Sequence, residues 1–227
     1  MAAVRREAGP DLSEAVQDYA KAIWALAQRS KRPVSTSAIA ERLGVSPASA
    51  SAMTGRLEAL GLVTREPYHG VELTPAGERV ALEVVRHHRL LELYLAEALG
   101  MPWDRVHEEA EVLEHAISPE LSELIAAKLG NPTHDPHGDP IPTAEGEIDD
   151  APSRSLADLA PGERGRFTRV SDSNPEMLRY LSARGIERGA ELELVDREPF
   201  GGPLTVLAGG REHALGEGLA RAMRVEG

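Results

Sequence analysis

The spacing of hydrophobic residues divides the chain into a helical N-terminal part and a C-terminal part of short strands. Over residues 11–30, apolar residues such as Tyr19, Ile23 and Leu26 recur at intervals of three to four, which is the helical period. Glycine and serine–proline signals mark the ends and starts of later helical patterns. Three more helices are predicted, at about 75–99, 103–116 and 118–130.

After residue 154 the apolar period falls to two, and Gly and Pro turns separate short apolar runs. One predicted helix, at about 175–184, interrupts these runs. Several short strands in about 70 residues indicate a small β-barrel. The expected fold class is therefore α+β, mainly helical at first and a barrel at the end. The predicted strands are Arg166–Val170, Glu191–Val195, Leu204–Leu207 and Met223–Val225.

Residues 35–63 show the pattern of a helix-turn-helix. A serine or threonine can cap a first short helix, which Gly44 ends, and Ser46-Pro47 supplies the cap and the first-turn proline of a second helix. Residues 62–73 then predict a two-stranded hairpin with its turn at 68–70. Such a unit is typical of winged-helix DNA-binding domains, although a helical packing unit without DNA would share the first part of the pattern.

The second helix of this unit carries small residues opposite its predicted buried side, Met53, Leu57 and Leu60. Small side chains let a helix approach base edges closely, while Arg56 and Arg65 are expected to hold phosphates. Because few long donors face the groove, readout of DNA shape is expected to matter as much as direct hydrogen bonds. The predicted DNA-contacting residues are Ser46, Pro47, Ala48, Ser49, Ser51, Ala52, Thr54, Arg56 and Arg65.

Charge and cysteine content narrow the choice of partners and ligands. The 227 residues carry a formal net charge of −12, yet the first 80 hold 10 Lys/Arg and 9 Asp/Glu, so only this part suits DNA. The chain has no cysteine, which excludes disulfides, zinc–thiolate sites and iron–sulfur clusters. Any metal must then be held by oxygen and nitrogen. No signal peptide or membrane span is visible, and a cytoplasmic location is expected.

The stretch RVHEEAEVLEH, residues 105–115, concentrates histidine and glutamate on a predicted helix. Residues three and four apart share a helix face, and two carboxylates on one face repel unless a positive group lies between them. The preceding helix carries His88 and Glu92 at i, i+4 spacing. Antiparallel packing would bring the two sets together as a metal site of hard oxygen and imidazole ligands, suited to Mn²⁺ or Fe²⁺. A solvated acidic face is the alternative. The predicted stripe is His107, Glu111, Glu114 and His115.

Three other histidines of this region are not expected to be ligands of the metal site. His87 points about 100° away from His88 on the helix and is expected at the surface. His134 and His137 are expected to be solvated, with loose metal binding as the alternative, because residues 131–154 are rich in Pro, Gly, His and Asp and are interpreted as a linker or extended arm. The helices before this segment are rich in Leu, Val and Ala but lack a closed core, which predicts burial against a second copy of the chain.

A winged helix, a two-helix metal stripe and a terminal barrel, in that order, resemble the diphtheria toxin repressor family of metal-dependent transcription regulators over nearly the whole chain. The most specific stretches are HHRLLE (87–92) and RVHEEAEVLEH (105–115), supported by LGVSPASASAMTGRLEALGLV (43–63). The resemblance implies an SH3-like or FeoA-like barrel and a homodimer with two metal sites per subunit. One site would use His88, Glu92 and His107.

The second site implied by the resemblance would use Glu111, Glu114 and His115, plus Asp18 from the first helix. Iron-responsive members carry Met and Cys at the positions of Asp18 and Glu111, so the carboxylates here favour Mn²⁺. The short manganese regulators have a further first-helix carboxylate where this chain has Lys21, and they lack the barrel. In long members the barrel donates a Glu and a Gln to the first site. The corresponding stretch here, RVSDSNPEMLRYL, offers Asp172 or Glu176.

The expected organisation is a DNA-binding domain at 1–80, metal-binding and dimerisation helices with the linker at 81–150, and the barrel at 151–227. The resemblance implies a Mn²⁺-activated repressor, with Fe²⁺ as the alternative, that binds palindromic double-stranded operator DNA and controls metal-uptake genes. No membrane partner, no small-molecule substrate and no enzymatic activity are expected. A metal-dependent hydrolase would hold a metal with the same ligands, but no nucleophile is evident. The third hypothesis is a DNA-binding regulator that does not depend on metal and whose acidic helix face is solvated.

Overall fold

The structure, a computed structural model, describes residues 12–29, 33–66, 70–149 and 151–227. It divides into two compact units. The first holds the chain up to Arg86 with residues 144–146, and the second holds residues 87–143 and 147–227. The expected three-part division at 80 and 150 stays a prediction. In the part of the chain that the structure describes, no helix has the length and apolar character that a membrane crossing requires.

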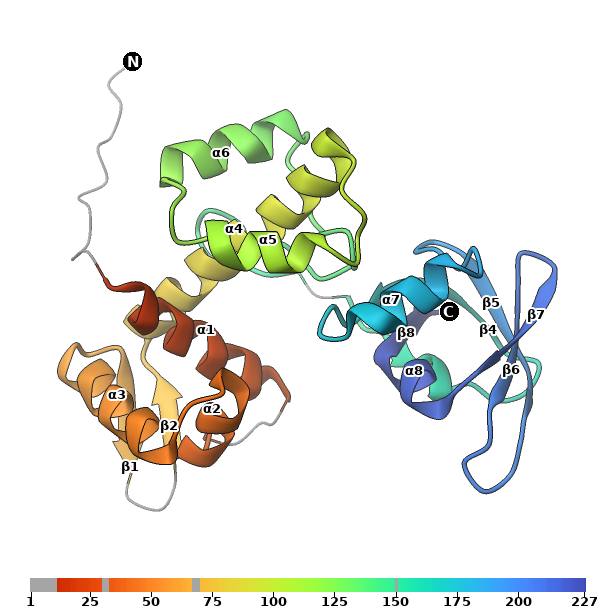
Figure 1. Ribbon diagram of the computed structural model, residues 1–227, viewed down its shortest axis with the longest axis horizontal. Helices are drawn as coiled ribbons and strands as arrows, with labels where there is room; N and C mark the ends of the chain where they lie inside the picture. Colours follow the sequence, from red (N-terminus) through yellow and green to blue (C-terminus); the bar gives the residue numbers. More distant parts are fainter. Residues whose placement is uncertain (1–11, 30–32, 67–69, 150) are drawn as a thin grey trace. The chain divides into compact units, whose positions relative to one another are not determined.

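The first unit is a winged helix-turn-helix (Figure 1). Its described elements are α1 (Glu14–Arg29), α2 (Thr36–Leu43), α3 (Pro47–Ala59), β1 (Val63–Glu66), β2 (Gly70–Leu73) and the first part of α4 (Pro75–Leu99). The two strands are antiparallel. The helix-turn-helix prediction for residues 35–63 is confirmed, whereas the predicted hairpin turn at residues 68–70 lies mostly outside the described residues.

Local capping explains where the two short helices begin and end. Ser35 Oγ accepts from the backbone N–H of Ala38, and Ser46 Oγ accepts from that of Ser49 at 3.0 Å. Gly44 ends α2 with φ +64°, a left-handed conformation that glycine adopts without strain. Leu57 and its neighbours fill the core. Leu60, predicted to be buried, is 45% exposed because it caps α3 after the helix has ended.

The second unit begins with the rest of α4, followed by α5 (Val106–Leu113) and α6 (Pro119–Lys128). These helices enclose a small core that includes Leu90, Ala110 and Ile125. The predicted helix at 103–116 is shorter in the structure, since the chain leaves the helix at Glu114 and turns towards the Ser118 cap of α6.

Residues 131–143 form no helix or strand, but they are not a free linker. Asp135 and His137 are buried, and Ile141 belongs to the helical core. Val170 N donates to His137 O at 3.0 Å, which fastens this segment to a barrel strand. The expectation of a solvated arm was therefore wrong for these residues, because Pro- and Asp-rich composition does not report the tertiary contacts that bury them.

The barrel confirms the prediction of short strands interrupted by a helix. A six-stranded antiparallel sheet has the order β3-β8-β4-β5-β6-β7 and encloses a core centred on Phe167, Leu192 and Val206. Strands β3 and β7, the 3₁₀ turn η1 and helix α8 were not predicted. The elements are β3 (Arg154–Ser155), the 3₁₀ turn η1 (Leu156–Asp158), β4 (Arg164–Val170), α7 (Pro175–Ser182), β5 (Glu191–Arg197), β6 (Leu204–Ala208), β7 (Arg211–Leu215), α8 (Glu217–Ala222) and β8 (Met223–Glu226).

Candidate metal centre

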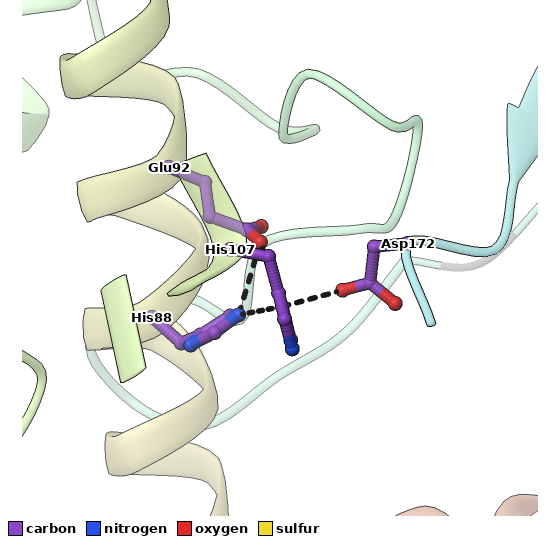
Figure 2. A group of neighbouring side chains, drawn as sticks. All are labelled: His88, Glu92, His107 and Asp172. Atoms are coloured by element: carbon purple, nitrogen blue, oxygen red, sulfur yellow. Dashed lines mark hydrogen bonds and ion pairs between the residues drawn. The ribbon is translucent and has the colours of Figure 1, made fainter. Parts of the chain in front are cut away.

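Four side chains from three segments of the second unit converge on one point (Figure 2). His88 and Glu92 come from successive turns of α4, His107 from α5, and Asp172 from the loop between β4 and α7. One nitrogen or oxygen of each lies within 4.8 Å of the others. The structure thus brings together every residue of the first predicted set and one of the two barrel candidates. Glu176 is exposed at the start of α7, in none of the described clusters.

The atoms at the centre are imidazole nitrogens and carboxylate oxygens. His107 Nδ1 lies 3.0 Å from Asp172 Oδ2 and 3.2 Å from Glu92 Oε1. His88 Nε2 lies 3.0 Å from the same Glu92 oxygen and 3.1 Å from His107 Nδ1. Two carboxylates and two imidazoles at these distances need positive charge between them, from protons or from a cation.

The pKa values show how the cluster balances its charge with protons. The hydrogen bond to Asp172, with that to Glu92, raises the pKa of His107 to about 10. Burial alone would raise the pKa of Glu92, but the imidazoles of His107, His137 and His88 hold it well below its usual range. A protonated His107 imidazole therefore supplies the positive charge that a divalent cation would otherwise bring to these carboxylates.

His88 also reaches a second carboxylate. Its Nδ1 lies 2.6 Å from Glu114 Oε2, a buried oxygen, so Nδ1–H donates outward. In the neutral ring Nε2 then presents its lone pair to the cluster. A carboxylate that orients a histidine in this way is a common outer-shell feature of metal sites. His87, predicted to lie at the surface, is instead 8% exposed, and its Nδ1 donates to the Glu114 carbonyl at 3.2 Å.

His137, expected from the sequence to be a solvated loop histidine, is instead buried and is a candidate ligand. Its side chain is fully buried, and its Nδ1 lies 3.7 Å from Glu92 Oε2, which is too far for a hydrogen bond. Neither atom has a hydrogen-bond partner among the described residues. Burial lowers the pKa of His137 but Glu92 raises it to about 9, so a proton on Nδ1 neutralises this oxygen, and a cation bound by both atoms would replace that proton. The sequence signal that could have found it is the pair of short-spaced donors in HDPH, 134–137.

Asp135 completes a buried group with Glu92 and His137. Burial, and then the charges of Asp139 and Glu92, raises the pKa of Asp135 well above its usual range. Its Oδ1 accepts from the backbone N–H groups of His137 and Asp139 at 2.8 and 2.9 Å, which shapes the turn. Asp135 thus fixes the backbone from which His137 reaches Glu92.

The second predicted set is only partly assembled within this unit. Glu111 and Glu114 lie close to His88, with Glu111 exposed and Glu114 buried. His115 Nε2 lies 3.5 Å from Glu114 Oε1. The prediction of one continuous helical stripe was wrong at its end, because α5 ends at Leu113, Glu114 is its C-cap and His115 follows. Asp18 is half-buried on α1 of the first unit, and its role stays a prediction.

The predicted DNA-contacting residues lie mostly at the surface of α3 and the hairpin. One is an exception: Thr54 is fully buried and its hydroxyl donates to Ser51 O at 3.0 Å, so the expectation that it contacts DNA was wrong. It falls on the inner side of the helix, three residues before buried Leu57. The exposed residues are Ser46, Pro47, Ala48, Ser49, Ser51, Ala52, Arg56 and Arg65.

Family descriptions match three consecutive parts of the chain. Residues 11–71 match the N-terminal DNA binding domain of the iron dependent repressor, and residues 74–143 match its metal binding and dimerisation domain. Residues 154–227 match the FeoA domain.

Individual relatives cover nearly the whole chain. The diphtheria toxin repressor of Corynebacterium efficiens is 32% identical, over 95% of this chain and 96% of that protein. The iron-dependent repressor IdeR of Mycobacterium tuberculosis is 30% identical, over 95% and 98%. A solved structure described as a manganese-dependent transcriptional repressor in complex with manganese is 45% identical, covers 92% of this chain and 98% of that chain, and has a TM-score of 0.86. The chain therefore belongs to the diphtheria toxin repressor family of metal-dependent, DNA-binding transcriptional repressors.

Proposed function

We propose that this protein is a Mn²⁺-activated homodimeric repressor of genes for metal uptake. The main support for the proposal is the cluster of His88, Glu92, His107 and Asp172, in which imidazole nitrogens and carboxylate oxygens lie within 4.8 Å of one another. The facing, unsatisfied atoms of Glu92 and His137 also fit a cation held at this place.

Manganese is favoured over softer ions by the donor set. The chain offers carboxylate and imidazole but no thiolate, and hard oxygen ligands suit Mn²⁺. The similar structure with 45% identity is described as a manganese complex. Fe²⁺ is the alternative, since other relatives are described as iron-dependent.

We propose that each subunit binds about two ions, one at the cluster and one at a second site. The ligands of the second site would be Glu111, Glu114, His115 and Asp18. A bound cation supplies positive charge where these carboxylates would otherwise repel. Glu114 and His115 would hold it from the second unit, and Asp18 from α1 of the DNA-binding unit. Metal binding then restrains the recognition helix α3 through α1.

A second copy of the chain completes the functional unit. Several large apolar side chains on the helices of the second unit are exposed, as expected of helices that pack against a second copy. With the helices of two subunits packed together, two α3 helices present a two-fold surface that matches a palindromic operator. The exposed side chains are Leu99 (63%), Val112 (73%), Leu121 (44%) and Leu124 (62%).

The proposal is tested by operator binding under anaerobic conditions, titrated separately with Mn²⁺, Fe²⁺ and Zn²⁺. A palindromic duplex is expected to bind the dimer tightly with Mn²⁺ and weakly without metal. Equal binding in the presence of a chelator would contradict metal activation. Activation by Fe²⁺ at lower concentration than Mn²⁺ would favour the iron-dependent alternative.

A further inference from the structure

Trp103 contacts three parts of the second unit beside the cluster. It lies between α4 and α5, and its carbonyl oxygen accepts a hydrogen bond from His137 Nε2 at 2.7 Å. Its indole ring stacks on the same imidazole, with centroids 5.9 Å apart and an angle of 21° between the planes. Its Nε1–H donates to Ser182 Oγ on α7 at 2.7 Å, and the ring packs against the barrel core. One residue therefore joins the imidazole beside Glu92 to the barrel.

These contacts determine which nitrogen of His137 faces the cluster. Since Nε2 donates to a backbone carbonyl, Nδ1 is left to face Glu92 Oε2, 3.7 Å away. The stacked indole opposes rotation of the imidazole out of this orientation. Outer-shell contacts that fix the tautomer and ring plane of a ligating histidine commonly change metal affinity when they are removed.

The barrel holds the same segment from its other side. Val170 N donates to His137 O, and Gly138 lies so close to the Thr168 carbonyl that a Cβ would collide with it. Asp172 follows β4 and reaches the cluster directly. The loop that carries Asp172 leads into α7, and Ser182 at the end of α7 accepts the hydrogen bond from the indole of Trp103. The barrel thus approaches the cluster through β4, through Asp172 and through Trp103.

We propose that Trp103 is a positioning residue that couples barrel docking to metal binding at the histidine–carboxylate cluster. The inference rests on the proposed function, because it takes the cluster to bind Mn²⁺. Without the indole, the His137 imidazole and α7 lose their common support. The affinity of the cluster then falls, although every donor atom that faces the cation is still present.

The test measures Mn²⁺ binding to the full-length chain by the electron paramagnetic resonance signal of the free ion. The parent protein carries His115→Ala, which removes a ligand of the second proposed site, so that the measured Mn²⁺ binding reports on the cluster. Trp103→Phe keeps the ring stack but deletes the N–H donor, and Ser182→Ala deletes its acceptor. Each is expected to weaken Mn²⁺ binding at the cluster by roughly 2- to 10-fold, the worth of one hydrogen bond. The double variant is expected to be no weaker than either single one.

Two further variants separate positioning from general stability. Trp103→Ala, which also loses the stack, is expected to weaken Mn²⁺ binding by about 10- to 100-fold. Trp24→Phe, in the first unit, changes the other of the two tryptophans and is expected to leave Mn²⁺ binding unchanged. With Trp24→Phe in place, the emission of Trp103 is expected to change with the same Mn²⁺ midpoint as the occupancy of the cluster.

The possible failures are distinguishable. If folded Trp103→Ala and Trp103→Phe proteins bind Mn²⁺ as the parent does, the positioning role is wrong while the proposed function stands. If the losses of Mn²⁺ affinity in Trp103→Phe and Ser182→Ala add up in the double variant, the positioning role is also contradicted, because the two residues would then not act through one shared hydrogen bond. If His107→Ala does not lower the amount of Mn²⁺ bound by the parent, the cluster is not a metal site and this inference is wrong, whereas metal activation itself is decided by the operator titration.

Discussion

Glu92 is the residue on which the contacts of the cluster converge. One of its oxygens lies against His88 and His107, and the other faces His137. The burial of His137 could not be predicted from the sequence, because a histidine in a Pro- and Asp-rich segment is usually solvated, and it is the packing of residues 131–143 that buries this one. His88, Glu92 and His107 could be predicted, since helical spacing alone places two of them on one face.

We expect Glu92→Gln to lower the Mn²⁺ affinity of the cluster by roughly 10-fold or more, because even outer-shell changes have effects of 10- to 100-fold. The amide keeps the shape of the side chain but removes the charge that attracts the cation. Equilibrium dialysis with metal analysis measures the loss. Glu97→Gln, an exposed glutamate of the same helix, is the matched control and is expected to bind Mn²⁺ normally. Equal affinity in both variants would show that Glu92 is not a ligand.

Asp18 and Glu111 are expected to set the choice of metal. Replacing both carboxylates in Asp18→Met with Glu111→Cys introduces softer sulfur donors, which should shift the preference from Mn²⁺ towards Fe²⁺. The measurement is the ratio of the Mn²⁺ and Fe²⁺ concentrations that half-activate operator binding. An unchanged ratio would mean that these two positions do not determine selectivity.

At the scale of elements, helix starts were easier to predict than helix ends. Ser46-Pro47 and Ser118-Pro119 mark the beginnings of α3 and α6, because cap and first-turn proline act locally. The end of α5 has no such signal, and the chain turns at Glu114 where its carboxylate meets His88. The position of His115 after the helix is therefore set by tertiary contacts.

The Ser46 cap gives a prediction at this scale. Ser46→Ala removes the acceptor of the Ser49 N–H and is expected to lower the free energy of unfolding by about 0.5–2 kcal/mol. Thermal unfolding followed by circular dichroism measures the change. Ser37→Ala, at an exposed position inside α2, is the control and should differ little from the wild type. A Ser46→Ala protein that melts with the control would show that the cap contributes nothing.

At the scale of the molecule, the order of winged helix, helices and barrel followed from the change of hydrophobic period along the chain. The attachment of residues 131–143 to the barrel did not, because it depends on single contacts such as Val170 N to His137 O. The barrel contributes Asp172 to the cluster, whereas Glu111, Glu114, His115 and Asp18 all precede it in the chain.

A chain that ends at residue 149 should therefore dimerise and retain metal-dependent operator binding, with weaker Mn²⁺ binding at the cluster. Analytical ultracentrifugation and operator binding with and without Mn²⁺ measure the two properties. A folded, dimeric truncation that does not respond to metal would show that the barrel is a required part of the response.

The central claim is that metal held by histidine and carboxylate side chains of this protein controls its binding to DNA. The most direct measurement is the fluorescence anisotropy of a palindromic operator during Mn²⁺ titration of the wild-type and His115→Ala proteins. Allosteric couplings are typically about 5- to 150-fold in affinity. The wild type is expected to gain affinity in this range. His115→Ala should lose most of the gain while keeping a normal circular dichroism spectrum and dimer mass. A His115→Ala protein with the Mn²⁺ dependence of the wild type would contradict the account.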